Sequence, residues 1–417
     1  MYSFHATEIS LIVFCPIIVY KYVVHIIRET KCLDVPHLRF PEFSGEWEKY
    51  KLSKICSFFS GGTPSSSKKE YYDGNIPFIR SGELHEEQTE LFITEDGFKN
   101  SAAKMVEVGD LLLALYGATS GDIAISKING AINQAILCIR TNQNKKFIES
   151  IWRKHVEKLL QTYLQGGQGN LSADIVKNIS FYFSRIEEQN KLAEFISLLD
   201  ERIATQNKII DKLESLIKGL SQQLLSSKND WILYRLDNLA QIKSGYSGTQ
   251  VSYRTPYKVS RIETISKHCI DMQRIGYAEN IPKNYKLNVG DIIFSNINSV
   301  QYIGNTAYID KDYGLYHGMN LLRIIPNTTI VIPRFLHLLL CTDWAINYFQ
   351  TICNKAVSQA SINQTELGKS RFPIPPIPVQ QQICSMFELT ERKLDNEQEY
   401  VSCLQQQKRY LLQEMFI

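Results

Sequence analysis

The chain has 417 residues, of which 44% are hydrophobic and 21% charged, and this composition excludes an intrinsically disordered protein. Its length predicts two or three domains, and its formal net charge of +3 neither indicates nor excludes a nucleic-acid partner. The nine cysteines are scattered without any Cys-x-x-Cys pair, which favours free thiols in a reducing cytoplasm over a disulfide framework.

The N-terminal segment is unusually apolar between residues 9 and 27. Its length approaches the roughly 20 residues that span a bilayer, but Pro16, Lys21 and His25 interrupt it and no signal-peptide cleavage site follows. We therefore expect residues 1–35 to form an N-terminal extension outside the functional domains. A membrane segment, or a peripheral helix or strand, is the alternative.

The segment that follows occurs twice in the chain. Residues 50–62 read "YKLSKICSFFSGG" and residues 234–246 read "YRLDNLAQIKSGY", with Tyr, Leu and Ser-Gly recurring 184 positions apart. Residues 106–117, "VEVGDLLLALYG", match residues 287–298, "LNVGDIIFSNIN". In both copies a Val-Gly-Asp turn precedes an apolar run that is typical of a buried strand.

A third pair of segments completes the repeat. Residues 166–183, "GGQGNLSADIVKNISFYF", match residues 357–374, "VSQASINQTELGKSRFPI". The repeating unit is therefore about 190 residues long, which is too long for a solenoid repeat and suits a duplicated domain.

Each copy ends in a segment whose apolar residues recur every three or four positions. This spacing predicts a coiled-coil helix of roughly 50 to 60 Å at residues 186–228 and another at residues 377–417. Two such seams in one chain favour pairing with each other, whereas the alternative is an amphipathic helix packed on its own domain. The predicted seam residues are Leu192, Ile196, Leu199, Ile203, Ile210, Leu213, Ile217, Leu220, Leu224, Ile383, Phe387, Leu394, Val401, Leu404, Leu411 and Met415, with Gln206 as a polar member.

Several stretches of residues 36–417 are similar to one known family. They are "PHLRFPEFSGEWEKYKLSKICSFFSGGTPSS", "GNIPFIRSGEL", "VGDLLLALYGATSGDIAI", "INQAI" and "FSRIEEQNKLAEFISLLDERI", the last with its second copy "PPIPVQQQICSMFELTERKL". Through these motifs and the duplicated layout, the chain resembles the specificity subunit, HsdS, of type I restriction-modification systems.

The resemblance implies an α+β fold with two duplicated mixed α/β target-recognition domains, at residues 36–185 and 229–376. Each would read one half of a split double-stranded DNA target. The two long helices would pair antiparallel, set the unread spacer and dock two modification (methyltransferase) subunits, and restriction (motor/nuclease) subunits would complete the complex. S-adenosylmethionine, ATP and Mg²⁺ would belong to those partners, with no cofactor on this chain.

The residues themselves carry no catalytic signature that we recognise. The double proline in "IPPIP", residues 374–378, lacks the polar side chain and the ring of an amino-methyltransferase clamp. In "NQTELGKS", Asn363 stands where a P-loop requires its first glycine. No histidine has a Cys or Glu partner at metal-ligand spacing. We expect neither catalytic nor metal-binding residues.

Three loops of the first domain combine small, polar and basic residues. Residues 60–74 combine small residues with two lysines and two tyrosines, which suits phosphate contacts and base stacking, although a solvated hairpin would show the same pattern. Glycines in residues 116–121 and 165–170 allow close approach to DNA. The candidate DNA-binding residues are Lys68, Lys69, Tyr71, Tyr72, Arg80, Ser81, Thr119, Ser120, Gln168 and Asn170.

The second domain is more basic, with 15 Lys and Arg against nine Asp and Glu in residues 231–375. Its Arg, Asn and Gln side chains suit bidentate contacts with guanine or adenine. Because its loops differ from those of the first domain, we expect an asymmetric target. The candidates are Lys243, Ser244, Tyr246, Tyr253, Arg254, Arg261, Asn296, Asn298, Ser299, Gln301, Tyr302, Gln359, Ser361 and Asn363.

Two other classes of function remain open from the sequence. A membrane-associated coiled-coil scaffold or adaptor would make residues 9–27 its anchor. A stand-alone nucleic-acid enzyme would need motifs that we do not find.

Overall fold

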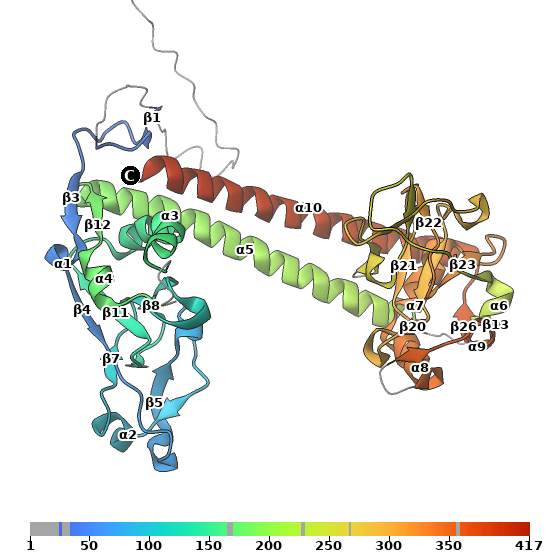
Figure 1. Ribbon diagram of the computed structural model, residues 1–417, viewed down its shortest axis with the longest axis horizontal. Coiled ribbons are helices and arrows are strands. Elements are labelled where there is room, and N and C mark those ends of the chain that lie inside the picture. The colour runs from blue at the N-terminus through green and yellow to red at the C-terminus, as the bar shows by residue number, and fades with distance from the viewer. Residues whose placement is uncertain (1–24, 27–33, 165–169, 227–229, 267, 356–358) are drawn as a thin grey trace, which may run out of the picture. The chain divides into compact units, whose positions relative to one another are not determined.

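The computed structural model divides the chain into two compact units. Unit 1 consists of Met1–Asn207 and Glu399–Ile417, and unit 2 of Lys208–Gln398. Each unit therefore contains part of both long helices (Figure 1). The structure describes residues 25–26, 34–164, 170–226, 230–266, 268–355 and 359–417.

The first copy of the repeat lies in unit 1. Figure 1 shows its β3, β12 and α3 beside the start of α5, with β5 and α2 at the opposite end of the domain. The elements are β1 (His25–Ile26), β2 (Leu38–Arg39), β3 (Glu48–Lys51), α1 (Leu52–Ile55), β4 (Cys56–Ser60), β5 (Tyr72–Ile79), β6 (Phe92–Ile93), α2 (Glu95–Lys99), β7 (Lys104–Val106), β8 (Leu111–Ala114), β9 (Ile123–Ile125), β10 (Gly130–Ile132), β11 (Ile136–Thr141), α3 (Lys145–Leu164), α4 (Ala173–Asn178), β12 (Ser180–Phe183) and α5 (Ile186–Leu224).

The second copy lies in unit 2 and repeats the order of the first. Its elements are β13 (Ile232–Arg235), α6 (Leu236–Leu239), β14 (Ala240–Ser244), β15 (Tyr257–Val259), β16 (Ile265–Ser266), β17 (Cys269–Ile270), β18 (Gly276–Ala278), β19 (Ile292–Ser295), β20 (Ile297–Asn298), β21 (Thr306–Tyr308), β22 (Leu315–Tyr316), β23 (Leu321–Pro326), α7 (Pro333–Leu340), α8 (Asp343–Ile352), β24 (Asn354–Lys355), β25 (Ala360–Ser361), α9 (Gln364–Lys369), β26 (Arg371–Ile374) and α10 (Ile377–Met415).

The sheets of the two copies have matching topology. The main sheet has the order β4-β11-β8-β9 in unit 1 and β14-β23-β19-β21 in unit 2, and each neighbouring pair is antiparallel. A second sheet in each copy contains one parallel pair, β5 with β10 or β15 with β22. The domain duplication that the repeat predicts is confirmed.

The Val-Gly-Asp turn has the same construction in both copies. Gly109 and Gly290 have φ angles of +91° and +96°, in the left-handed region that favours glycine. The carboxylates of Asp110 and Asp291 accept hydrogen bonds from the backbone N–H three residues earlier. Strands β8 and β19 follow these turns, and all of their residues are buried, as predicted.

Each turn aspartate also pairs with an arginine on the adjacent strand. Arg140 lies 2.6 Å from Asp110, and Arg323 lies 2.6 Å from Asp291. Burial by itself raises the pKa of Asp110, but hydrogen bonds from Arg140 and the Glu107 backbone, together with the positive charges of Arg140 and Lys145, bring that pKa below its usual value. At Asp291, burial outweighs the hydrogen bonds from the Asn288 backbone and Arg323, so the pKa of this carboxylate is raised.

The repeated Ser-Gly pair has a steric explanation. A Cβ atom on Gly61 would lie 1.8 Å from the carbonyl oxygen of Ile132, and one on Gly245 would lie 1.8 Å from that of Gly318. Only glycine allows the backbone after β4 and β14 to approach the neighbouring loop so closely.

Replacement of Gly245 by alanine should destabilise unit 2 by at least about 3 kcal/mol, because the backbone of Gly318 has to move. Gly219→Ala is the matched control in the same unit, since nothing lies within 4 Å of its Cβ position in α5. That change should be neutral or should stabilise the helix by up to about 1 kcal/mol. Urea unfolding of both variants measures the difference, and equal free energies of unfolding would contradict this explanation.

The long helices run antiparallel within each unit. In unit 1 the first turns of α5, including Leu192 and Leu199, share a core with Leu411 and Met415 from the last turns of α10. In unit 2 Ile217, from the second half of α5, packs against the core that contains early residues of α10. The predicted fold class, with two duplicated mixed α/β domains and an antiparallel pair of long helices, is confirmed.

Both helices end earlier than the sequence analysis predicts. α5 ends at Leu224 rather than at residue 228. Just beyond this end, the Ser226 hydroxyl donates to the carbonyl oxygen of Gln223 and so competes with the helical hydrogen bonds. α10 ends at Met415 rather than residue 417, because Phe416 leaves the helix to become buried in the core of unit 1.

The predicted seam residues all face inward, since each is buried or half-buried. Polar contacts accompany the seam in unit 1. Lys146 and Lys408 both pair with Asp200, and Arg202 lies 5.6 Å from the ring centroid of Tyr400. Gln206 is only 2% exposed within α5.

The apolar stretch of residues 9–27 lies outside the described residues apart from β1, which pairs with β2. None of the helices in the described part of the chain combines the length and apolarity that a membrane crossing requires. The seven described cysteines are free thiols.

Candidate nucleic-acid interface

Loops that are far apart in the sequence join at the same place in both copies. In unit 1 the backbone N–H of Leu171 donates to the carbonyl of Leu115, 2.9 Å away. In unit 2 the N–H of Ile362 donates to the carbonyl of Asn296, also at 2.9 Å. Each bond connects the loop after the buried strand to the loop before a short helix, α4 or α9.

Unit 2 extends this junction into a small sheet of order β20-β25-β24. Ile297 pairs with Ser361, and Asn298 pairs with Ala360. The sheet therefore brings together candidates from two segments about 60 residues apart, with Asn296, Asn298 and Ser361 half-buried in it. Unit 1 has a single turn of 3-10 helix, Gly117–Thr119, after its buried strand.

Tyr71 and Tyr72 are structural residues rather than free stacking surfaces, contrary to the prediction. Tyr71 is only 8% exposed, and its hydroxyl accepts a hydrogen bond from Lys68 at 2.9 Å. Tyr72 is half-buried and donates to the carbonyl of Pro64 at 2.7 Å. Lys68, Tyr71 and Tyr72 therefore serve packing within the loop, and Lys69 is the exposed lysine of this stretch without such a contact among the described residues.

The two candidate arginines at the start of 3-10 turns already have partners. The guanidinium of Arg80 contacts Glu83 at 2.6 Å and Glu90 at 2.8 Å, so two carboxylates neutralise it. Arg261 occupies the equivalent place in unit 2, and its Nε donates to Gln250 at 2.6 Å. A phosphate group near Arg80 would therefore compete with these two carboxylates.

Other candidates also serve local structure. Asn363 caps α9, because its Oδ1 accepts the backbone N–H of Glu366 at 2.8 Å, so this side chain is a helix cap rather than a free reader. Asn298 uses both ends of its amide within its own turn, with Ser295 and Ser299 as partners.

The remaining candidates differ in exposure. Ser81, Thr119, Ser120, Tyr246 and Ser299 are half-buried. Gln168 lies outside the described residues. The candidates exposed to solvent are Lys68, Lys69, Arg80, Asn170, Lys243, Ser244, Tyr253, Arg254, Arg261, Gln301, Tyr302, Gln359 and Asn363.

The structure also identifies surface residues that the sequence analysis missed. Thr63 donates to the side chain of Gln134 at 2.8 Å, and this contact joins the loop after β4 to the "INQAI" motif. In unit 2 the exposed residues Met319 and Asn320 occupy the corresponding loop, and Asn320 has a φ angle of +63°. The sequence signal that could have identified these residues is a turn that occurs between β10 and β11 and again between β22 and β23.

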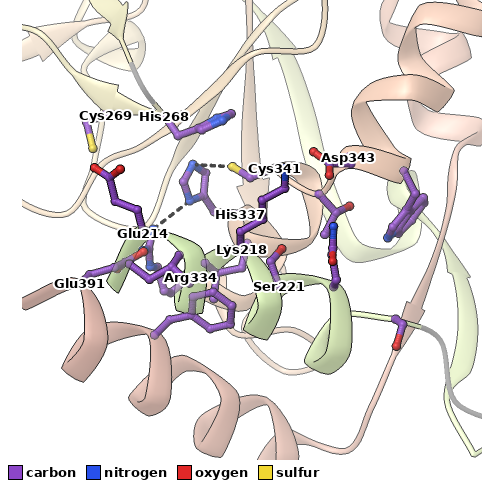
Figure 2. Close-up of a pocket in the computed structure, with 17 residues that line it drawn as sticks. Glu214, Lys218, Ser221, His268, Cys269, Arg334, His337, Cys341, Asp343 and Glu391 are labelled. Atoms are coloured by element: carbon purple, nitrogen blue, oxygen red, sulfur yellow. Dashed lines mark hydrogen bonds and ion pairs between the residues drawn. The ribbon is translucent and has the colours of Figure 1, made fainter. Parts of the chain in front are cut away.

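A pocket of about 650 Å³ in unit 2 contains none of the candidate readers. Figure 2 shows its His337 and Cys341, whose Nε2 and Sγ atoms are 3.4 Å apart. Burial raises the pKa of Cys341 to about 12 and holds the pKa of His337 well below its usual value, so both groups stay neutral. Such a pair lacks the thiolate of a nucleophilic cysteine.

No group of three or more His, Cys, Asp or Glu side chains in the described part of the chain could hold a metal ion.

One fold therefore occurs twice, and in each copy the polar loop after the buried strand is hydrogen-bonded to the loop before a short helix. The family model described as "Type I restriction modification DNA specificity domain" matches residues 44–215 and again residues 228–401. The chain belongs to the type I restriction-modification DNA specificity family.

Individual relatives agree with this family. The MjaX specificity subunit of Methanocaldococcus jannaschii is 36% identical over 193 residues, which is 45% of this chain and 45% of that protein. The MjaVIII specificity subunit of the same organism is 22% identical over 395 residues, covering 85% of this chain and 87% of its own length.

A solved structure shares the fold. The crystal structure of the S subunit from M. genitalium covers 92% of this chain and 99% of its own chain, with a TM-score of 0.58 and 14% identity.

Arg254→Ala should cost roughly 1–3 kcal/mol of binding free energy at one base pair of the target, because Arg254 is exposed in a loop that suits guanine readout. Arg371→Ala is the matched control, since Arg371 is also exposed in unit 2 but lies on strand β26 and is not a candidate reader. Binding of the complex to single-base variants of the target measures the effect. If the two variants show the same binding affinities for every single-base variant of the target, Arg254 does not read a base.

Proposed function

We propose that this chain is the DNA-reading subunit of a type I restriction-modification complex. Each of its two domains reads one half of a bipartite target, and the long helices set the unread spacer between the halves. The observation that carries the proposal is the duplication itself: one fold occurs twice, each copy matches a DNA specificity domain, and the joined loops differ between the copies.

The differences between the loops support an asymmetric target. Both copies have a short 3-10 turn after the buried strand, Gly117–Thr119 and Val300–Tyr302, but their sequences differ, and among the described residues the second copy also has the sheet of β20, β25 and β24. Residues 231–375 are also clearly basic, with 15 Lys and Arg against nine Asp and Glu. Different side chains at equivalent places present different hydrogen-bond donors and acceptors to the base edges.

The partners follow from the same proposal. Two modification subunits dock on the repeated parts of the chain, and restriction subunits complete the complex in the cytoplasm. S-adenosylmethionine, ATP and Mg²⁺ bind to those subunits, and this chain is not catalytic.

The chain alone should methylate no DNA, whereas the chain purified with its modification subunits should methylate adenine or cytosine within one defined sequence. Incubation with labelled S-adenosylmethionine and DNA measures both reactions. Methyl transfer by the isolated chain, or failure of the chain to bind any methyltransferase subunit, would refute the proposal.

The membrane-associated scaffold is not favoured as an alternative. Both matched segments are DNA specificity domains, and together they cover most of the described residues. Recovery of the chain in membrane fractions without any methyltransferase partner would reopen it.

A further inference from the structure

The fourth residue of each long helix is a glutamine whose side chain is buried. Gln189 in α5 is 1% exposed, and Gln380 in α10 is 0% exposed. The two residues lie 191 positions apart, the same offset that relates the last matching segments of the repeat. A buried side-chain amide needs hydrogen-bond partners, and both glutamines find them in equivalent places.

Gln189 connects three parts of unit 1. Its Nε2 donates to the carbonyl of Ser184 and to the side chain of Gln143, both at 2.7 Å. Its Oε1 accepts the backbone N–H of Asn144 at 3.2 Å. The start of α5 is thereby bonded to the segment that leaves β12 and to the loop that leads into α3.

Gln380 makes the same connections in unit 2. Its Nε2 donates to the carbonyls of Pro375 at 2.9 Å and Ile330 at 3.1 Å. Its Oε1 accepts the N–H of Ile332 at 2.8 Å. These bonds join the start of α10 to the segment that leaves β26 and to the loop that leads into α7. We call each set of three bonds a glutamine bridge.

The bridges lie where each domain joins its long helix through two residues. A helix of 39 residues is about 58 Å long, so a tilt of roughly 3° at one end moves the other end by about 3 Å. That displacement is close to the rise of one base pair, about 3.4 Å. A spacer that is accurate to one base pair therefore needs an accurate angle between domain and helix.

Apolar packing alone does not fix the angle between domain and helix accurately, because hydrophobic contact is not directional. Hydrogen bonds depend on direction as well as distance, and a single buried amide can set the register of packed helices. We infer that Gln189 and Gln380 are positioning residues, which hold each recognition domain at a fixed angle to its helix and so restrict the complex to one spacer length. This inference rests on the proposed function.

The two bridges should differ in importance. Between β26 and α10 the connecting residues are Pro375 and Pro376, whose rings already restrict the backbone. Between β12 and α5 they are Ser184 and Arg185, which have no such restriction. Loss of Gln189 should therefore relax the spacer more than loss of Gln380.

The test is methylome sequencing of cells that express the modification subunits with the wild-type chain, Gln189→Leu or Gln380→Leu. Gln381→Leu is the control, because Gln381 is an exposed glutamine next to Gln380 on α10. Gln189→Leu should keep both half-sites but raise methylation of sites with a spacer one base pair longer or shorter by about fivefold or more. Gln380→Leu should show a smaller rise, and Gln381→Leu none.

Each other outcome has a definite meaning. A single unchanged spacer in the folded Gln189→Leu variant would overturn the positioning role. Thermal unfolding of the purified complexes identifies a variant that fails to fold, and failure of both leucine variants to fold would reduce the bridges to a contribution to domain stability. Absence of any bipartite motif with the wild-type chain would instead refute the proposed function.

Discussion

Exchange of residues 231–375 for the equivalent domain of a relative should change one half of the methylated sequence and leave the other half unchanged. The exchanged segment begins one residue before β13 and ends one residue after β26, and these strands pair with each other from Ile232–Ile374 to Arg235–Arg371. The replacement therefore enters and leaves the chain on neighbouring strands of one domain. Methylome sequencing of cells that contain the hybrid and the modification subunits reads both halves directly.

The expected effect is large because several base pairs change together. Each misread base pair costs about 1–3 kcal/mol, or roughly 5- to 150-fold in affinity, so the original target should no longer be methylated. The matched control is the reciprocal exchange between β3 and β12, which also pair with each other. It should change the opposite half. If either exchange alters both halves, the domains do not read independently.

Insertion of four residues after Gln206 should lengthen the spacer by one or two base pairs and leave both half-sites unchanged. Gln206 lies inside α5, so the insertion adds about 6 Å of helix and little more than one turn. Since DNA also rotates between adjacent base pairs, sites of the original spacing should bind poorly.

The same four residues inserted after Lys311 provide the control. Lys311 is exposed in the loop between β21 and β22, outside both long helices and outside the residues of the glutamine bridges. This variant should keep the original spacer. An unchanged spacer with full activity after the Gln206 insertion would mean that the helices hold the protein together without measuring DNA.

The fold was largely predictable because its signals are periodic. The 184-residue repeat identifies two copies of one domain, and the apolar spacing of the helices identifies their buried face. The ends of those helices were less predictable, since they depend on single contacts such as Ser226 with the carbonyl of Gln223. The internal loop geometry that makes Gly61 and Gly245 necessary is also invisible in the sequence.

The candidate interface was less predictable for a physical reason. The sequence shows which side chains can contact DNA, but not which of them already bind a neighbour. Tyr71 is buried under Lys68, the guanidinium of Arg80 is occupied by two carboxylates, and Asn363 caps a helix. The contact between Thr63 and Gln134 joins residues 71 positions apart, and only the folded sheet brings them together.

The most direct test of the account is the methylome of cells that contain the wild-type chain and its modification subunits, compared with cells that lack the chain. We predict one chain-dependent motif with two short defined halves, separated by a spacer of fixed length and variable sequence, in which the halves are not inverted copies of each other. A continuous motif, a palindromic motif, or methylation that persists without this chain would contradict the account.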